Sequence, residues 1–208
     1  MGLPSCWSNS SVPLVLDASV AINLNATGNA SRILGAIPNA IVIVDVVARE
    51  LEAGRLKGRT DADMVAALVV SGRAQLESLS ADCEGNFLAM VSGSGAATLD
   101  DGEAATIAWA VANGGIPVID EKKGLAIGQD RFSLPMATTT DLLVHELVLA
   151  ELGAVELAES VFNALTRARM RVQERHIPWV VKTIGQERAA LCTSLPRSSR
   201  IARSHCFE

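Results

Sequence analysis

The chain has 208 residues, of which 49% are hydrophobic and 20% are charged, and its net charge is −5. This length and composition fit one large domain with a buried core. They exclude a membrane-spanning protein, because the longest uncharged run, Ala104 to Ile119, is interrupted by Asn113-Gly114-Gly115 and Pro117 and never offers the roughly 18 apolar residues that a bilayer requires.

Strands are expected where short β-rich apolar runs occur: Pro13 to Leu16, Ala40 to Val44, Gln75 to Leu79, Ile116 to Ile119 and, more weakly, Leu134 to Ala137. Helical periodicity predicts helices near Ala18 to Asn25, Ala30 to Leu34, Val46 to Ala53, Asp61 to Val70, Ala81 to Val91, Gly102 to Ala112, Lys122 to Ile127, Asp141 to Leu152 and Val155 to Arg175. This alternation predicts an α/β fold in which a parallel sheet has helices on both faces.

The end of the chain differs from its body. Pro178 is expected to close the last helix near Ile177, because proline lacks the N–H that a helix interior needs. We expect one domain over residues 10–185 and an irregular basic tail over residues 186–208, rich in Ser and Arg.

Charge is distributed unevenly. Residues 1–159 hold nine Lys and Arg against twenty Asp and Glu, whereas residues 160–208 hold nine against three. The basic segment is either a solvated helix face with a tail, or a surface for nucleic acid or an acidic partner.

The four cysteines show neither metal spacing nor a close-set disulfide framework, and the first sixteen residues carry no positive charge, so we expect a cytoplasmic location.

Two aspartates follow predicted strands directly. Asp17 ends the strand in LVLDASVAI, and Asp120 ends the strand in PVIDEKKG. One interpretation is that each carboxylate caps the helix that follows it, since the side chain of Asp readily accepts a hydrogen bond from a free backbone N–H at a helix start. In open parallel sheets, however, ligands bind beyond the carboxyl ends of the strands, so the two acids also indicate a site.

A third group of acids opens the helix in LDDGEAATIAWA. Asp100 and Glu103 have capping-box spacing. The helix is apolar all round and should be buried, which places Glu103 at the edge of the core.

Helix geometry separates two neighbouring acids in VVARELEAG. Glu50 follows Val46 by four residues and Val47 by three, so we expect it to point inward, whereas Glu52 lies about 200° away around the helix. A carboxylate at the core without a cationic partner is costly, which again indicates a site.

Asp17, Glu50, Glu103 and Asp120 could converge at one edge of the sheet, where a cation would relieve their repulsion. Mg²⁺ or Mn²⁺ suits such oxygen ligands and can activate water for phosphodiester cleavage. Zinc fits less well, because the three histidines are scattered and form no Cys/His pair with zinc spacing.

In order and approximate separation, LVLDASVAINL, VVARELEAG, LDDGEAATIAWA and VIDEKKG resemble the four acidic motifs of the PIN-domain nucleases, especially small prokaryotic members with a GEA signature. The resemblance extends over about Pro13 to Thr183. It implies a three-layer α/β/α fold, a Mg²⁺ or Mn²⁺ site and endoribonuclease activity on RNA. Many such proteins are toxins that an antitoxin holds inactive.

The same resemblance implies that Asp17, Glu50, Glu103 and Asp120 are the catalytic metal ligands. It also implies that Ser19 is the small hydroxyl residue beside the first acid. Glu121 is an alternative or additional fourth acid, and Asp101 an outer partner. The chain departs from the family pattern at Leu125, where an arginine would be expected.

Arg167, Arg171 and Arg175 recur every four residues along the last predicted long helix. They are expected to form a row that follows RNA phosphates, contacts an antitoxin, or simply faces solvent. A possible homodimer is a further expectation.

Other protein classes fit less well. A haloacid-dehalogenase-like phosphatase needs a second Asp two residues after the first, where this chain has Ser19, and the acid pair and lysine of a response-regulator receiver are not evident. The main alternative is a PIN-like binding module without catalysis, whose acids are structural and whose basic segment binds a partner.

Overall fold

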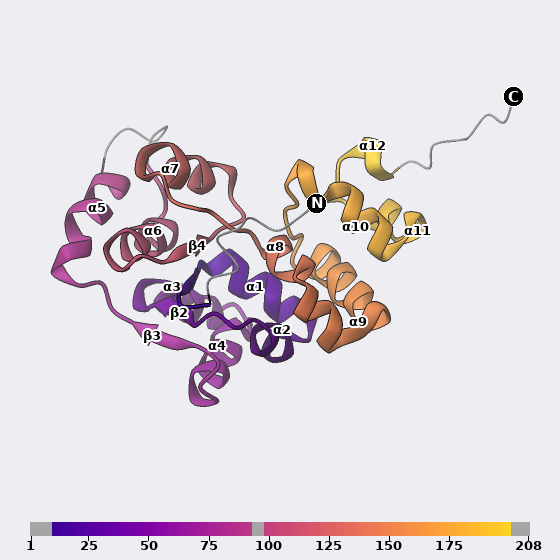
Figure 1. Ribbon diagram of the computed structural model, residues 1–208, viewed down its shortest axis with the longest axis horizontal. Coiled ribbons are helices and arrows are strands. Elements are labelled where there is room, and N and C mark those ends of the chain that lie inside the picture. The colour runs from indigo at the N-terminus through magenta and orange to yellow at the C-terminus, as the bar shows by residue number, and fades with distance from the viewer. Residues whose placement is uncertain (1–9, 93–97, 201–208) are drawn as a thin grey trace, which may run out of the picture.

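A computed structural model describes residues 10–92 and 98–200. In this part of the chain, four parallel strands form one sheet in the order β3-β2-β1-β4. The strands are β1 (Leu14–Leu16), β2 (Ile41–Val44), β3 (Gln75–Glu77) and β4 (Ile116–Val118). Helices lie on both sides of the strands (Figure 1), which confirms the three-layer α/β/α prediction.

Side chains of the central strands alternate between two cores. Leu14 and Leu16 of β1 enter the larger apolar cluster, whereas Val15 enters a smaller cluster on the opposite face. A strand buried on both faces needs apolar residues at every position, which explains the uninterrupted runs of β1 and β2. No helix in the described residues is both long and apolar enough to cross a membrane.

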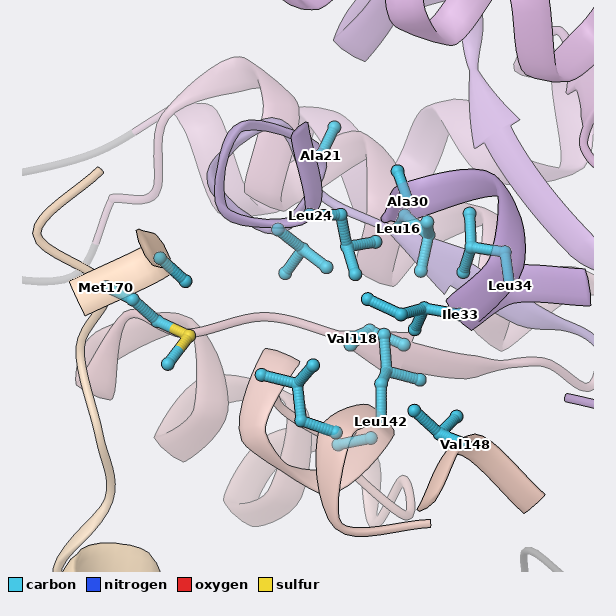
Figure 2. Packing of buried hydrophobic residues seen from close by; sticks show 14 of the residues in the cluster. Leu16, Ala21, Leu24, Ala30, Ile33, Leu34, Val118, Leu142, Val148 and Met170 are labelled. Atoms are coloured by element: carbon cyan, nitrogen blue, oxygen red, sulfur yellow. The ribbon is translucent and has the colours of Figure 1, made fainter. Parts of the chain in front are cut away.

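The larger cluster is covered by α1 (Ala18–Thr27), α2 (Ala30–Ala36), α4 (Asp61–Val70), α8 (Thr139–Val144) and α9 (Glu146–Arg167). Leu24 and Ile33 from the first two helices meet Val118 of β4 and Leu142 of α8 in this core (Figure 2). This packing fixes α1, and with it the residue that precedes it, against the sheet.

The opposite face is covered by α6 (Asp101–Asn113), on which α5 (Ala81–Val91) and α7 (Lys122–Phe132) pack. Ala105, Trp109 and Ala110 of α6 lie on Val15 and Val42 of the sheet. Between the two layers, α3 (Asp45–Arg55) follows β2 and contacts both α4 and α6. The starts of α1, α3 and α6 therefore meet near the carboxyl ends of the strands.

The prediction of one helix from Val155 to Arg175 is wrong. The observed helix α9 ends at Arg167, and Arg169 then adopts a left-handed backbone with φ 55°. The chain continues through a short 3₁₀ turn, Glu174–His176, into α10 (Ile177–Ile184). Pro178 opens α10 instead of closing a helix, as proline does when it stands in the first turn, where its missing N–H is not needed.

The prediction of an irregular segment from residue 186 is also wrong as far as residue 200. This part contains α11 (Gln186–Leu191) and α12 (Arg197–Arg200). Ala189, Cys192 and Leu195 are buried in the larger cluster, which explains why the segment is ordered despite its polar composition. The remaining predicted tail, residues 201–208, lies outside the described part of the chain.

Candidate functional site

Asp17 stands between β1 and α1 and is 3% exposed. Its Oδ2 caps α1, accepting hydrogen bonds from the backbone N–H of Ser19 at 3.1 Å and from Ser19 Oγ at 2.6 Å. Its Oδ1 points to the start of α6, 3.3 Å from where a Cβ would stand at Gly102. Burial is the main cause that raises the pKa of Asp17, against the opposing hydrogen bonds from Ser19.

Glu50 reaches the same place from α3. Its residue surface is exposed, so the expected burial is wrong, but its carboxyl does point toward the other acids. Glu50 Oε2 lies 2.5 Å from where a Cβ would stand at Gly102, so a side chain at this position would have to displace the Glu50 carboxyl. Desolvation, followed by the charges of Asp17, Asp100 and Asp101, raises the pKa of Glu50 to about 7.

Glu103 is 5% exposed, in the first turn of α6. Asp100 caps this helix through the backbone N–H of Glu103 at 2.9 Å. Capping does not account for the buried Oε1 of Glu103, which has no hydrogen-bond partner among the residues that the structure describes. Burial, and then the charges of Asp100, Asp17 and Glu121, raise the pKa of Glu103 to about 8.

Asp120 follows β4 and is 2% exposed. Its Oδ2 accepts from Asn23 Nδ2 at 2.6 Å and from Thr139 Oγ1 at 2.5 Å, and its Oδ1 accepts from the Thr139 backbone N–H at 2.8 Å. Burial raises its pKa to about 6 although these hydrogen bonds oppose the shift. Asp17 also raises it, and so acts electrostatically on Glu50, Glu103 and Asp120 alike.

Sequence reasoning missed Asn23, which holds Asp120 in place together with Thr139. The signal for Asn23 was its position, since a polar residue between Val20 and Leu24 falls on the buried face of α1. The signal for Thr139 was present in the Thr138–Thr140 run, where Thr138 caps α8 and Thr139 turns its hydroxyl to Asp120.

The two secondary acids differ in their surroundings. Glu121 is half-buried and pairs with Arg171 at 2.6 Å, which turns part of its charge away from the other acids. Asp101 is exposed and acts on Glu50 through its charge. Asp120 is therefore more deeply buried than Glu121, and Asp101 lies at the surface.

The three arginines do not form a row along one helix, which corrects the prediction. Arg167 ends α9 and is exposed. Beyond the helix, Arg171 pairs with Glu121 and Arg175 pairs with buried Asp141 at 2.7 Å. Gln173, between them, donates to the backbone carbonyl of Asp120 at 3.5 Å. We call residues 171–176 the strap, because they run beside Asp120.

The donor set fits a hard divalent cation. The neighbouring carboxyls supply oxygen ligands, and the pKa values of Glu50 and Glu103 are raised first by burial and then by the surrounding acids. A buried Glu103 oxygen has no hydrogen-bond partner in the part of the chain that the structure describes. Among the described residues, no three His, Cys, Asp or Glu side chains are arranged to hold a metal ion together.

Comparison with known proteins gave one family match. A protein-family profile described as a PIN domain matches residues 13–186. Neither the curated proteins nor the solved structures that were searched gave a match.

Proposed function

Because the chain belongs to the PIN-domain family, whose members are generally nucleases, we propose that it is a metal-dependent endoribonuclease that hydrolyses RNA phosphodiester bonds. The observation that carries the proposal is the buried Oε1 of Glu103. This oxygen has no hydrogen-bond partner within residues 10–92 and 98–200, and burial together with the charges of three further acids raises the pKa of its carboxyl. A structural role leaves such an atom unexplained, whereas a bound cation or its water satisfies it.

We propose that Asp17, Glu50, Glu103 and Asp120 surround one Mg²⁺ or Mn²⁺, directly or through water. The ion would polarise a phosphate oxygen and supply an activated water. The protein's own part is positional: Ser19 holds Asp17, Asn23 and Thr139 hold Asp120, and Gly102 leaves room for Glu50. Because its pKa is raised to about 8, the Glu103 carboxyl is mostly protonated near neutral pH, and a bound cation would favour its ionised form.

Cleavage by Asp17→Asn compared with wild type tests this function. On mixed single-stranded RNA in Mg²⁺ or Mn²⁺, the wild type should cut and EDTA should stop it. Asp17→Asn should reduce the cleavage rate by at least about a hundredfold, since it removes the negative charge of the acid that interacts with Glu50, Glu103 and Asp120. Asp82→Asn, an exposed acid on α5, is the matched control and should cut normally. A wild type that cuts no RNA with either metal would refute the proposal.

The biological setting forms a finer part of the proposal. By resemblance to small prokaryotic PIN proteins, the chain would be a toxin neutralised by an antitoxin, and a second copy of the chain is a further partner to be tested. The alternative is a binding module without catalysis, in which the acids are structural. RNA that binds but stays intact in Mn²⁺ would favour that alternative.

A further inference from the structure

A hollow of about 880 Å³ opens beside the acids, between α3 and α5. Val46, Arg49 and Glu50 of α3 line one wall, and Glu84, Phe87 and Leu88 of α5 line the other. The hollow is continuous with the proposed metal site, because Glu50 belongs to both and Asp100 at the start of α6 also lines it. Its size lies within the range of about 300–1,000 Å³ that ligand sites occupy.

Both walls are set by helix spacing. Each contributes residues at positions i, i+3 and i+4, which lie on one face of a helix. The face on α5 is anchored, because Phe87 is half-buried. It packs against the smaller apolar cluster that contains Val15 and against a further group of buried residues from α5 and α6 that includes Met90 and Ala104. Leu88, by contrast, is 54% exposed. The wall therefore offers an aromatic ring held in place beside an apolar side chain open to solvent.

We propose that this hollow binds an unpaired RNA base next to the phosphate that is cut, an inference that rests on the proposed function. The charge of the lining favours a base over a phosphate. Arg49 is the one cation among the described residues that line the hollow, against several acids. A neutral base avoids their repulsion and stacks on Phe87, as unpaired bases do on aromatic side chains. Arg49, whose side chain is 73% exposed, stands at the rim for the adjoining phosphate.

Glu84 makes this base site selective for guanine. It stands one helical turn before Phe87 and Leu88, so its carboxylate faces the edge of a base stacked on the ring. An ionised carboxylate only accepts hydrogen bonds. Guanine presents two adjacent donors, N1–H and N2–H₂. Uracil presents one N–H between two carbonyl oxygens that the carboxylate repels, and adenine and cytosine each place an acceptor beside their amino group.

Binding of short single-stranded RNAs to the cleavage-deficient Asp17→Asn protein, measured by fluorescence anisotropy in Mg²⁺, tests the inference. The RNAs are uridine chains that carry a single G, A or C. Guanine should bind about tenfold more tightly than uracil, and adding Glu84→Gln should abolish that preference. Adding Phe87→Leu, which keeps an apolar side chain, should weaken binding of every RNA by about tenfold, because stacking is tolerant of sequence.

Two controls are matched to these changes. Asp82→Asn lies on the same helix outside the hollow, and Phe132→Leu lies on α7 outside it. Both should bind like the Asp17→Asn protein alone. The inference is overturned if Glu84→Gln and Phe87→Leu also bind like that protein, or if no RNA binds at all. Cleavage by the otherwise wild-type chain is scored separately, so a base preference without cleavage supports the base site while refuting the nuclease.

Discussion

Asp17 combines a structural and a chemical role in one side chain. Its Oδ2 caps α1 through Ser19, and its Oδ1 is directed toward Gly102 and the other acids. An N-cap and a site acid are thus not alternatives here, because a carboxylate has two oxygens and each takes a different partner. At the start of α6 the two roles fall on different residues, because the Asp100 side chain caps the helix and the buried Oε1 of Glu103 has no hydrogen-bond partner among the described residues.

Gly102 gives the sharpest prediction at a single residue. A methyl group there would lie 2.5 Å from Glu50 Oε2, so Gly102→Ala should push the Glu50 carboxyl away from the site. We expect RNA cleavage to fall by roughly ten- to hundredfold, because small displacements of a reacting group are costly. Thermal stability should hold, since alanine favours a helix over glycine by about 1 kcal/mol.

Gly85→Ala is the matched control for this change, because Gly85 is also helical and a Cβ there meets nothing within 4 Å. It should leave cleavage at the wild-type rate. Equal cleavage by Gly102→Ala and Gly85→Ala would contradict the placement of Glu50. A lower melting temperature of Gly102→Ala would instead show that this glycine is needed for the stability of the fold.

The site acids were predictable from the sequence where position along an element decides the outcome. Asp17 and Asp120 follow buried strands, and strand ends meet at one sheet edge. The exposure of Glu50 was not predictable, because the start of α3 emerges beside a hollow that depends on where α5 packs. Asn23 was missed for a similar reason, since its partner Asp120 is 97 residues away.

At the scale of elements, the strap gives two arginines different roles. Arg171 has an exposed side chain and pairs with half-buried Glu121, whereas Arg175 pairs with Asp141, whose side chain is 2% exposed. His176 binds the same carboxylate at 2.8 Å. Burial opposes ionisation of Asp141, but hydrogen bonds from His176 and Thr138 and the charges of His176 and Arg175 outweigh it and lower its pKa.

We therefore expect Arg171→Gln to weaken RNA binding by the Asp17→Asn protein and to flatten its salt dependence by about 0.7 in slope, as for one lost contact to a single-strand phosphate. Arg175→Gln should instead lower the melting temperature, by about 2–4 °C for each kcal/mol lost from the pair that half-exposed Arg175 makes with buried Asp141. Arg167→Gln, a change at an exposed arginine outside the strap, is the comparison. Equal salt slopes for all three variants would remove the strap from the RNA path.

The four strands of the sheet and the first seven helices were predicted to within a few residues, because apolar periodicity dominates there. The fifth predicted strand, Leu134 to Ala137, is wrong, since Ala137 makes an isolated bridge to Val118 instead of a strand. The end of α9 was not predictable from periodicity. Val172 continues the apolar spacing of the helix, yet Arg169 takes a left-handed backbone without the glycine that normally marks such a turn. The helices after residue 186 were missed because short amphipathic segments are stabilised by packing, here through Ala189 and Leu195, more than by their own composition.

At the scale of the whole molecule, the acids make metal-free stability depend on pH. The pKa of Glu103 rises from 4.5 to about 8 on folding, and that of Glu50 from 4.5 to about 7. Between pH 4.5 and about pH 8 the folded chain therefore binds more protons than the unfolded chain. The contribution of Glu103 and Glu50 to the free energy of unfolding is greatest at low pH and falls as the pH rises through this range. A divalent cation would replace those protons and remove the loss.

The central claim is that these carboxyls hold a divalent cation, and titration calorimetry with Mn²⁺ near pH 7 tests it most directly. Repeating the titration in buffers of different ionisation enthalpy gives the number of protons released. We expect wild type and Glu52→Gln to bind Mn²⁺ with release of about one proton, and Glu103→Gln to bind more weakly with less release. Absence of binding, or binding of Mn²⁺ by Glu103→Gln with wild-type affinity and proton release, would contradict the account.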